Sequence, residues 1–133
     1  MDLIERMLID YFKGIRVKAR IMDEIRNIEQ FNSNYKEALQ SNLIPEREKE
    51  IAKRIQENNK KIIIKQLDLQ NILENEIKVN FYFEYLNQQE IEIVKLRYQK
   101  GYTLQKIATI VNYSKASMSR KNIKILNKLS KLN

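Results

Sequence analysis

Basic and hydroxyl-bearing side chains are concentrated between residues 103 and 124. Of all the residues in the chain, these have the types and spacing that best suit binding of a ligand. Lys and Arg pair with phosphates and guanine acceptors, and Ser and Thr hydrogen-bond to phosphates or base edges. The binding would be non-covalent recognition of nucleic acid. The candidate DNA-contacting residues are Thr103, Lys106, Ser114, Lys115, Ala116, Ser117, Ser119, Arg120, Lys121 and Lys124.

The positive charge of the chain is confined to the same region. The 133 residues carry a formal net charge of +8. Residues 95–133 hold eight Lys, two Arg and no acidic residue, so this segment is +10 and the other 94 residues sum to −2. Charges of one sign repel each other, so a polyanion such as nucleic acid is the natural partner of the segment. A solvated basic tail and a membrane-surface helix are the alternatives.

The missing residue types exclude several kinds of chemistry. The sequence has no His, Cys or Trp, which rules out a zinc finger, an iron–sulfur cluster, a disulfide and a catalytic triad. The carboxylates are not grouped at metal-ligand spacing. Those at Asp68, Glu74, Glu76 and Glu84 lie on predicted helix faces without a glycine-rich loop. We therefore expect no metal, no cofactor and no enzymatic activity.

The sequence also predicts a cytoplasmic location and no membrane partner. No apolar run approaches the roughly 18–20 residues that a membrane span needs. The acidic residues Asp2 and Glu5 are not typical of a signal peptide. A chain without Cys fits a reducing compartment.

Capping residues indicate which helices position the basic side chains. Asn87 and Glu90 have the spacing of a capping box, which predicts a helix from there to about Gln99. Gly101 suits the left-handed position after that helix. Thr103 and Ser114 are candidate N-caps of two further helices. The inward-facing residues expected on these helices are Ile91, Val94, Leu96, Tyr98, Leu104, Ile107, Ala108, Val111, Met118, Ile125 and Leu129.

The second and third of these helices are joined by a short turn. Ala108 lets two helices approach closely, and Asn112 tolerates the positive φ that a tight turn requires. The third helix would then present Ser117, Arg120 and the small residue Ala116 near its N-terminus. A helix of this kind can enter the major groove while the preceding helix lies across the DNA backbone. This pattern predicts a DNA-binding helix-turn-helix.

The same residues resemble region 4 of bacterial sigma factors. The resemblance rests on Leu86-x3-Glu90-x3-Val94-x-Leu96-Arg97-Tyr98-x2-Gly101-x-Thr103-x3-Ile107-Ala108-x4-Tyr113-Ser114-x3-Met118-x-Arg120. The ending Ser114-x2-Ser117-x2-Arg120-x3-Lys124-Ile125-Leu126-x-Lys128-Leu129 is similar to phage transcriptional regulators of the RinA/ArpU type. The resemblance covers residues 80–130, with Met118 in place of the usual branched aliphatic residue.

This resemblance implies a phage or prophage activator of late genes that binds double-stranded DNA near their promoter. No sigma region 2 is present, which argues against a complete sigma factor. The alternative is a small terminase-type packaging subunit, an oligomeric helix-turn-helix protein that binds a packaging site. A coiled-coil adaptor that binds RNA polymerase without DNA is a third interpretation. For the transcriptional regulator, RNA polymerase is a possible additional partner.

The N-terminal half predicts a long helical hairpin. Residues 3–28 carry an apolar stripe at helical spacing that includes Ile4, Leu8, Tyr11, Ile15, Met22 and Ile25. Residues 31–43 lose the periodicity and are expected to form a connection, with a short helical turn around Tyr35 to Leu39. Pro45 starts a second helix, expected to end near Glu76. The two stripes would pack against each other or pair two chains, so we expect a homodimer through the N-terminal helices.

Residues 77–86 alternate like a strand but also fit a helix, and we predict a helix because a lone strand has no partner. The aromatic residues at 81, 82, 83 and 85 are expected to be core, with a base-stacking platform as the alternative. The sequence thus predicts an all-α fold. Residues 1–76 form the hairpin for oligomerisation or partner binding, and residues 77–133 form a three-helix, sigma-region-4-like DNA-binding domain.

Overall fold

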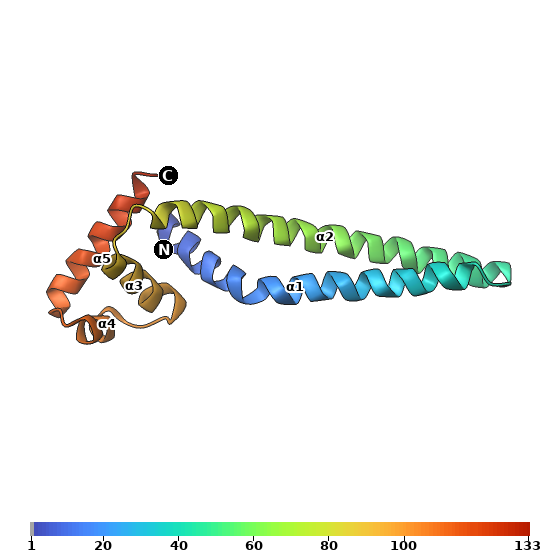
Figure 1. The fold of residues 1–133 in the computed structure, drawn as a ribbon, viewed down its shortest axis with the longest axis horizontal. Helices are drawn as coiled ribbons and strands as arrows, with labels where there is room; N and C mark the ends of the chain where they lie inside the picture. Colours follow the sequence, from blue (N-terminus) through green and yellow to red (C-terminus); the bar gives the residue numbers. More distant parts are fainter. Residues whose placement is uncertain (1) are drawn as a thin grey trace. The chain divides into compact units, whose positions relative to one another are not determined.

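The computed structural model describes residues 2–133, and every element in this range is helical, which confirms the all-α class. The elements are α1 (Leu3–Leu39), α2 (Pro45–Phe83), α3 (Gln88–Val94), the π-helix η1 (Lys95–Gln99), α4 (Leu104–Val111) and α5 (Lys115–Ser130) (Figure 1). Within the described range, no helix is long and apolar enough to cross a membrane.

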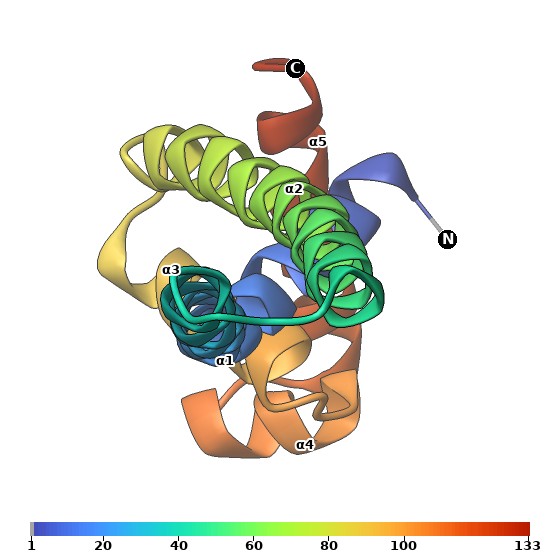
Figure 2. The same ribbon diagram turned by 90° about the vertical axis from the view of Figure 1, so that its right-hand side faces the viewer.

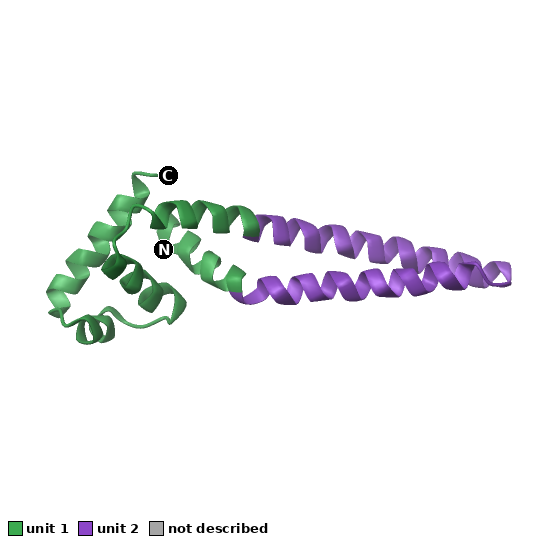
Figure 3. Ribbon diagram, in the orientation of Figure 1, with its two compact units in different colours: residues 1–15, 73–133 green, residues 16–72 purple. Residues whose placement is uncertain are grey.

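The chain forms two compact units (Figure 3). Unit 1 combines residues 1–15 with residues 73–133, and unit 2 consists of residues 16–72. Both long helices contribute to both units, because α1 and α2 each pass from one unit into the other. The expected domain boundary between residues 76 and 77 lies inside α2.

Helix α1 is longer than the sequence pattern predicts. The expected connection at residues 31–43 is too long: residues 31–39 belong to α1, which continues to Leu39, and the turn to α2 spans residues 40–44 (Figure 2). Asn32, which interrupts the apolar pattern, is buried. It donates a hydrogen bond to Oδ1 of Asn59 and accepts one from Nδ2 of Asn58, each at 3.0 Å. These bonds satisfy the buried amide, so a residue typical of loops is accommodated within a helix.

Helix α2 also exceeds its predicted length. It begins at Pro45, as expected, but the predicted end near Glu76 is wrong because the helix continues to Phe83. Val79 and Tyr82, both buried, hold this last part of α2 in the core of unit 1. The ambiguous segment is therefore helical through Phe83, and the prediction of helix over strand is confirmed there.

Within unit 2 the two helix segments run antiparallel. Nζ of Lys65 lies 2.6 Å from Oε2 of Glu24, and the guanidinium of Arg54 donates to the hydroxyl of Tyr35 at 3.4 Å. The later residue of α1, Tyr35, pairs with the earlier residue of α2, Arg54, so the two helices run in opposite directions. The hydrogen bond from Lys65 lowers the pKa of Glu24.

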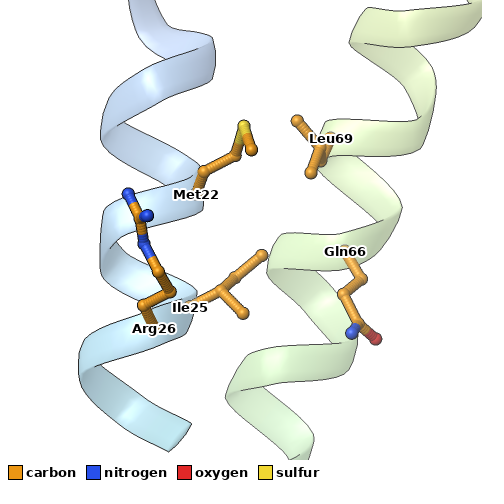
Figure 4. A pocket seen from close by; sticks show the side chains of 5 residues that line it. All are labelled: Met22, Ile25, Arg26, Gln66 and Leu69. Carbon is orange, nitrogen blue, oxygen red and sulfur yellow. The ribbon is translucent and has the colours of Figure 1, made fainter. Parts of the chain in front are cut away.

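The apolar packing of unit 2 is thin. Only Ile21 and Ile25 are buried among its apolar side chains. Met22 and Leu69 point toward each other across an open pocket that is also lined by Ile25, Arg26 and Gln66 (Figure 4). Two helices cover only a narrow strip of one another, so much apolar surface of this unit stays exposed.

The buried stripe of α1 differs in part from the predicted one. Ile4, Leu8 and Ile25 are buried as expected, but Ile15 and Met22 are exposed. Met22 lines the open pocket, where no further helix of the described residues covers it. Ile21, which widens the predicted stripe, is buried as expected, and Phe12, which the predicted stripe leaves out, is buried too.

Unit 1 contains the main hydrophobic core. Its centre is formed by residues from the start of α1, the end of α2 and all of the shorter helices, whose side chains are buried together. These residues are Ile4, Leu8, Phe12, Val79, Tyr82, Leu86, Ile93, Val94, Tyr98, Ile107, Ala108, Met118, Ile125 and Leu129. Residues of α4 and α5 are therefore packed in one core with residues of α1, α2, α3 and η1.

The aromatic cluster at the end of α2 is divided between core and surface. Tyr82 is buried and Phe83 packs partly buried against the core. Phe81 and Tyr85 are exposed and form an edge-to-face pair with ring centroids 5.3 Å apart. The expectation of a core role is thus wrong for Phe81, which lies on a face of α2 that the core does not cover, and for Tyr85, which lies in the turn after α2.

Candidate nucleic-acid interface

Helix α3, which precedes the candidate interface and packs beneath it, begins with a complete capping box. The side chain of Asn87 accepts a hydrogen bond from the backbone N–H of Glu90 at 2.8 Å. The Glu90 carboxylate accepts one in return from the N–H of Asn87 at 3.0 Å. Both bonds match the predicted box and satisfy N–H groups that the helix itself leaves unpaired.

Glu90 also ties α3 to α5. Glu90 is 2% exposed, and its two carboxylate oxygens lie 3.2 and 3.4 Å from Nζ of Lys128. Lys121 lies 3.9 Å from the same carboxylate. Burial opposes ionisation of Glu90, but the bonds from Asn87 and Lys128 and the charge of Lys121 outweigh it, so the pKa of Glu90 is lowered.

The helical segment that begins with α3 ends at Gln99, as the sequence predicts. Its last five residues, 95–99, form the π-helix η1. Tyr98 is buried as expected of a core residue. Arg97 donates to the carbonyl of Tyr102 at 2.9 Å, which braces the turn before α4. Gly101 has a φ of 74° in that turn, confirming its left-handed conformation.

Thr103 and Lys106 occupy the first turn of α4. The Thr103 hydroxyl accepts a hydrogen bond from the N–H of Lys106 at 3.2 Å, so the predicted N-cap is confirmed. The Lys106 ammonium lies 3.8 Å from the ring centroid of Tyr102, over its face. Both Thr103 and Lys106 are exposed. Together they place one hydroxyl and one cation at the N-terminal end of α4.

The connection from α4 to α5 consists of residues 112–114. Asn112 has a φ of 64° and ends α4 in the left-handed conformation that the sequence predicts. The hydroxyl of Tyr113 donates to Oε1 of Gln89 at 2.8 Å, which fastens the connection to α3. Ser114 then caps α5 by accepting a hydrogen bond from the N–H of Ser117 at 3.0 Å. The geometry of the turn is thus set by three polar side chains.

The N-terminal turn of α5 carries a chain of polar contacts. The hydroxyls of Ser114 and Ser117 lie 2.8 Å apart. The Arg120 guanidinium donates to the hydroxyl of Ser117 at 3.2 Å. Arg120 is exposed, so this bond orients a guanidinium that faces solvent.

The outward face of α5 is opposite its buried residues. Met118, Asn122, Ile125 and Leu129 face the core. Positions spaced by three or four residues on the opposite side share one surface. We name this surface the outward line, and it consists of the exposed residues Ala116, Arg120, Ile123, Lys124 and Asn127.

The ten predicted site residues are divided by the structure into two groups. Nine lie on the first turn of α4 or on the cap and the exposed or half-exposed surface of α5. Lys121 differs, because its side chain pairs with buried Glu90 and is 22% exposed. This pairing gives no support to a DNA contact by Lys121.

Two residues of the outward line were missed by sequence reasoning. Ile123 is 58% exposed, and Asn127 is also exposed. They follow Arg120 by three and seven residues, and these spacings place residues on the same face of a helix. The sequence therefore contained enough information to assign them to this surface.

The chain was also compared with known proteins. No family model, curated protein or solved structure matches it. The interface is therefore interpreted from its own geometry and charge. Across the described residues, no group of three or more acidic side chains could hold a metal ion.

Proposed function

We propose that this chain is a sequence-specific DNA-binding transcriptional regulator of the phage RinA/ArpU type. In this proposal α4 and α5 act as a sigma-region-4-like helix-turn-helix, and α5 enters the major groove. The observation that carries the proposal is the outward line of α5. It combines a guanidinium, an ammonium, an amide, a methyl group and an exposed aliphatic side chain on one helical face.

These side chains match the chemistry of base edges and phosphates. Arg120 has the donors for guanine O6 and N7, and Asn127 has the donor and acceptor that pair with adenine. Ala116 and Ile123 offer apolar contact for the methyl group of thymine. Lys106, Lys115 and Lys124, all exposed, would bind phosphates and fix the position of α5.

The charge distribution supports the same proposal. Residues 95–133 contain no acidic side chain, and the carboxylate that pairs with Lys121 and Lys128 is that of Glu90 in α3. Glu90 compensates these two lysines at the supported side of α5. The cations on the outward line lie on the other side of α5, where their positive potential attracts a polyanion.

The proposal includes a homodimer formed through the N-terminal helices, acting in the cytoplasm of a bacterial host as an activator of late phage genes. Exposed apolar residues on unit 2, among them Ile63, Ile64 and Leu67, support a protein contact there. Two DNA-binding units in a symmetric dimer would select an operator with two half-sites. RNA polymerase is an additional partner that the proposal leaves open.

The proposal is tested by selecting bound duplexes from random DNA and titrating the best one with salt. An enriched motif and a steep fall of log affinity with log salt are expected, because several phosphates are neutralised. Absence of binding would reject the proposal. A ring of about eight or more copies in light scattering would favour the small-terminase alternative instead.

A further inference from the structure

Helix α2 carries an exposed apolar stripe that the fold leaves uncovered. Ile63, Leu67, Ile77 and Phe81 are 56%, 55%, 73% and 47% exposed. They follow one another at intervals of 4, 10 and 4 residues, which places them on one face of the helix. We call this surface the α2 stripe. The residues of α2 that face α1, such as Asn58 and Lys65, lie on another side of the helix.

The α2 stripe has the period of a coiled-coil seam. Gln70 and Glu74 complete the series at positions 63, 67, 70, 74, 77 and 81, with alternating spacings of 4 and 3 residues. This alternation is the a/d pattern of a heptad repeat. The seam therefore has two apolar ends and a polar centre.

The seam is complementary to itself in the antiparallel direction. We infer that α2 pairs with α2 of a second copy of this chain, antiparallel and centred on Ile72. In this register Ile63 meets the partner's Phe81, and Leu67 meets the partner's Ile77. A two-fold axis repeats each contact, as in any isologous dimer. The inference deepens the dimer contained in the proposed function and does not depend on DNA binding.

Charge complementarity selects the second copy and its direction. Lys60 is the seam position of α2 that precedes Ile63, and Glu84 is the first residue after α2 and follows Phe81 at the same spacing of three. Both residues are exposed. In the antiparallel register Lys60 meets the partner's Glu84 at each end of the interface. A parallel register would instead oppose Lys60 to Lys60 and Glu84 to Glu84. Opposite charges steer the antiparallel arrangement, and like charges oppose the parallel one.

The flank of the seam agrees with the same register. Leu73 is 38% exposed and lies next to the seam, near the proposed two-fold axis. The antiparallel register brings Leu73 close to its own copy in the partner. An apolar residue at the axis adds buried surface where the seam itself is polar.

Cysteine cross-linking tests the register directly, because the natural chain has no Cys. Leu67→Cys and Ile77→Cys chains are prepared separately, with distinguishable tags. An oxidised mixture is expected to give a covalent dimer of twice the 16.0 kDa chain mass that contains both tags. Each variant alone stays monomeric on a non-reducing gel. Cross-linking of Leu67→Cys with itself would overturn the antiparallel register.

Charge exchange gives a second test in the full chain without cysteine. Lys60→Glu and Glu84→Lys are each expected to raise the dimer dissociation constant in sedimentation. The double variant restores it, because the pair is re-formed with reversed signs. Failure of the double variant to recover would overturn the pairing of Lys60 with Glu84.

Disruption of the stripe separates this inference from the proposed function. Ile77→Lys is expected to give a monomer, because Ile77 is the most exposed member of the stripe. Phe31→Lys, on an exposed face of α1, is the matched control and stays dimeric. A wild-type monomer, or a dimer unaffected by Ile77→Lys, would overturn the inference. DNA binding measured on the same samples reports separately on the proposed function.

Discussion

The hydroxyl of Tyr98 donates a hydrogen bond of 3.0 Å to Oε2 of Glu5, although the two residues are 93 positions apart. The bond joins η1 to the first turns of α1 within unit 1. Tyr98 is buried, so this contact connects the N-terminal helix to the support beneath α4 and α5.

We predict that Tyr98→Phe lowers the free energy of unfolding by about 1 kcal/mol, because the Glu5 carboxylate loses a donor. Burial and the bond to Glu5 raise the pKa of Tyr98 above its ordinary value of 10.0. The stabilisation of the folded protein by the protonated Tyr98 hydroxyl is complete below pH 10 and is lost as the pH rises through the raised pKa. Urea unfolding at pH 7 and at alkaline pH measures both effects, with Tyr85→Phe as the exposed control. Equal effects of the two variants would contradict the prediction.

Glu90→Gln is expected to lower the free energy of unfolding by about 1–2 kcal/mol at pH 7, since Lys128 loses a charged acceptor. Gln retains the capping box, so the loss reports on the ion pairs. The pKa of Glu90 lies below its ordinary value of 4.5. Its stabilisation is therefore complete above pH 4.5 and is lost as the pH falls through the lowered pKa. Unfolding curves of both proteins should converge in acid, and a constant difference would refute this assignment.

The left-handed turn at Asn112 gives a prediction about backbone conformation. Asn112→Gly is expected to be close to neutral, because Gly adopts a φ of 64° without strain. Asn112→Val is expected to destabilise the protein by about 1–2 kcal/mol. Thermal unfolding of the pair separates strain from loss of the side chain. A similar loss in both variants would point to the amide itself.

Arg120 and Lys121 are neighbours that should differ in DNA binding. Arg120→Ala is expected to weaken binding to the selected duplex by about 1–3 kcal/mol if Arg120 contacts a base. Lys121→Ala is expected to change the affinity much less, because Lys121 pairs with Glu90. Fluorescence anisotropy on selected and random duplexes measures both. Equal loss on the two duplexes would make Arg120 a phosphate contact, and no loss on either would contradict the role of α5.

Ile123 is expected to detect thymine methyl groups. Replacing a contacted thymine by deoxyuridine removes only the methyl group, so the wild-type protein should lose affinity for that duplex. Ile123→Ala should bind both duplexes equally while keeping its salt dependence on random DNA. Scanning each thymine of the selected site provides the measurement. Equal discrimination by wild-type and variant proteins would exclude Ile123 as the reader.

Local signals were sufficient for the turns and caps of the candidate interface. Asn87, Thr103 and Ser114 cap their helices, and Gly101 and Asn112 take positive φ, as their sequence positions predict. Each of these features depends on hydrogen bonds or backbone sterics within a few residues. Such short-range physics is contained in the local sequence.

Long-range packing decided the features that were mispredicted. Asn32 remains helical because Asn58 and Asn59 satisfy its amide from α2. Phe81 resembles a core residue in sequence but lies on the face of α2 that the core does not cover. The pairing of Lys121 with buried Glu90, at 3.9 Å, likewise depends on a residue of another helix that the local sequence does not indicate.

The sequence by itself therefore determined the all-α class, the caps and the segregation of positive charge into residues 95–133. Only the tertiary structure decided where the long helices end, which cations are compensated, and which apolar residues stay exposed. The physical reason is that propensity and capping act over a few residues. Burial and charge pairing instead depend on partners distant in the chain, as Tyr98 and Glu5 are.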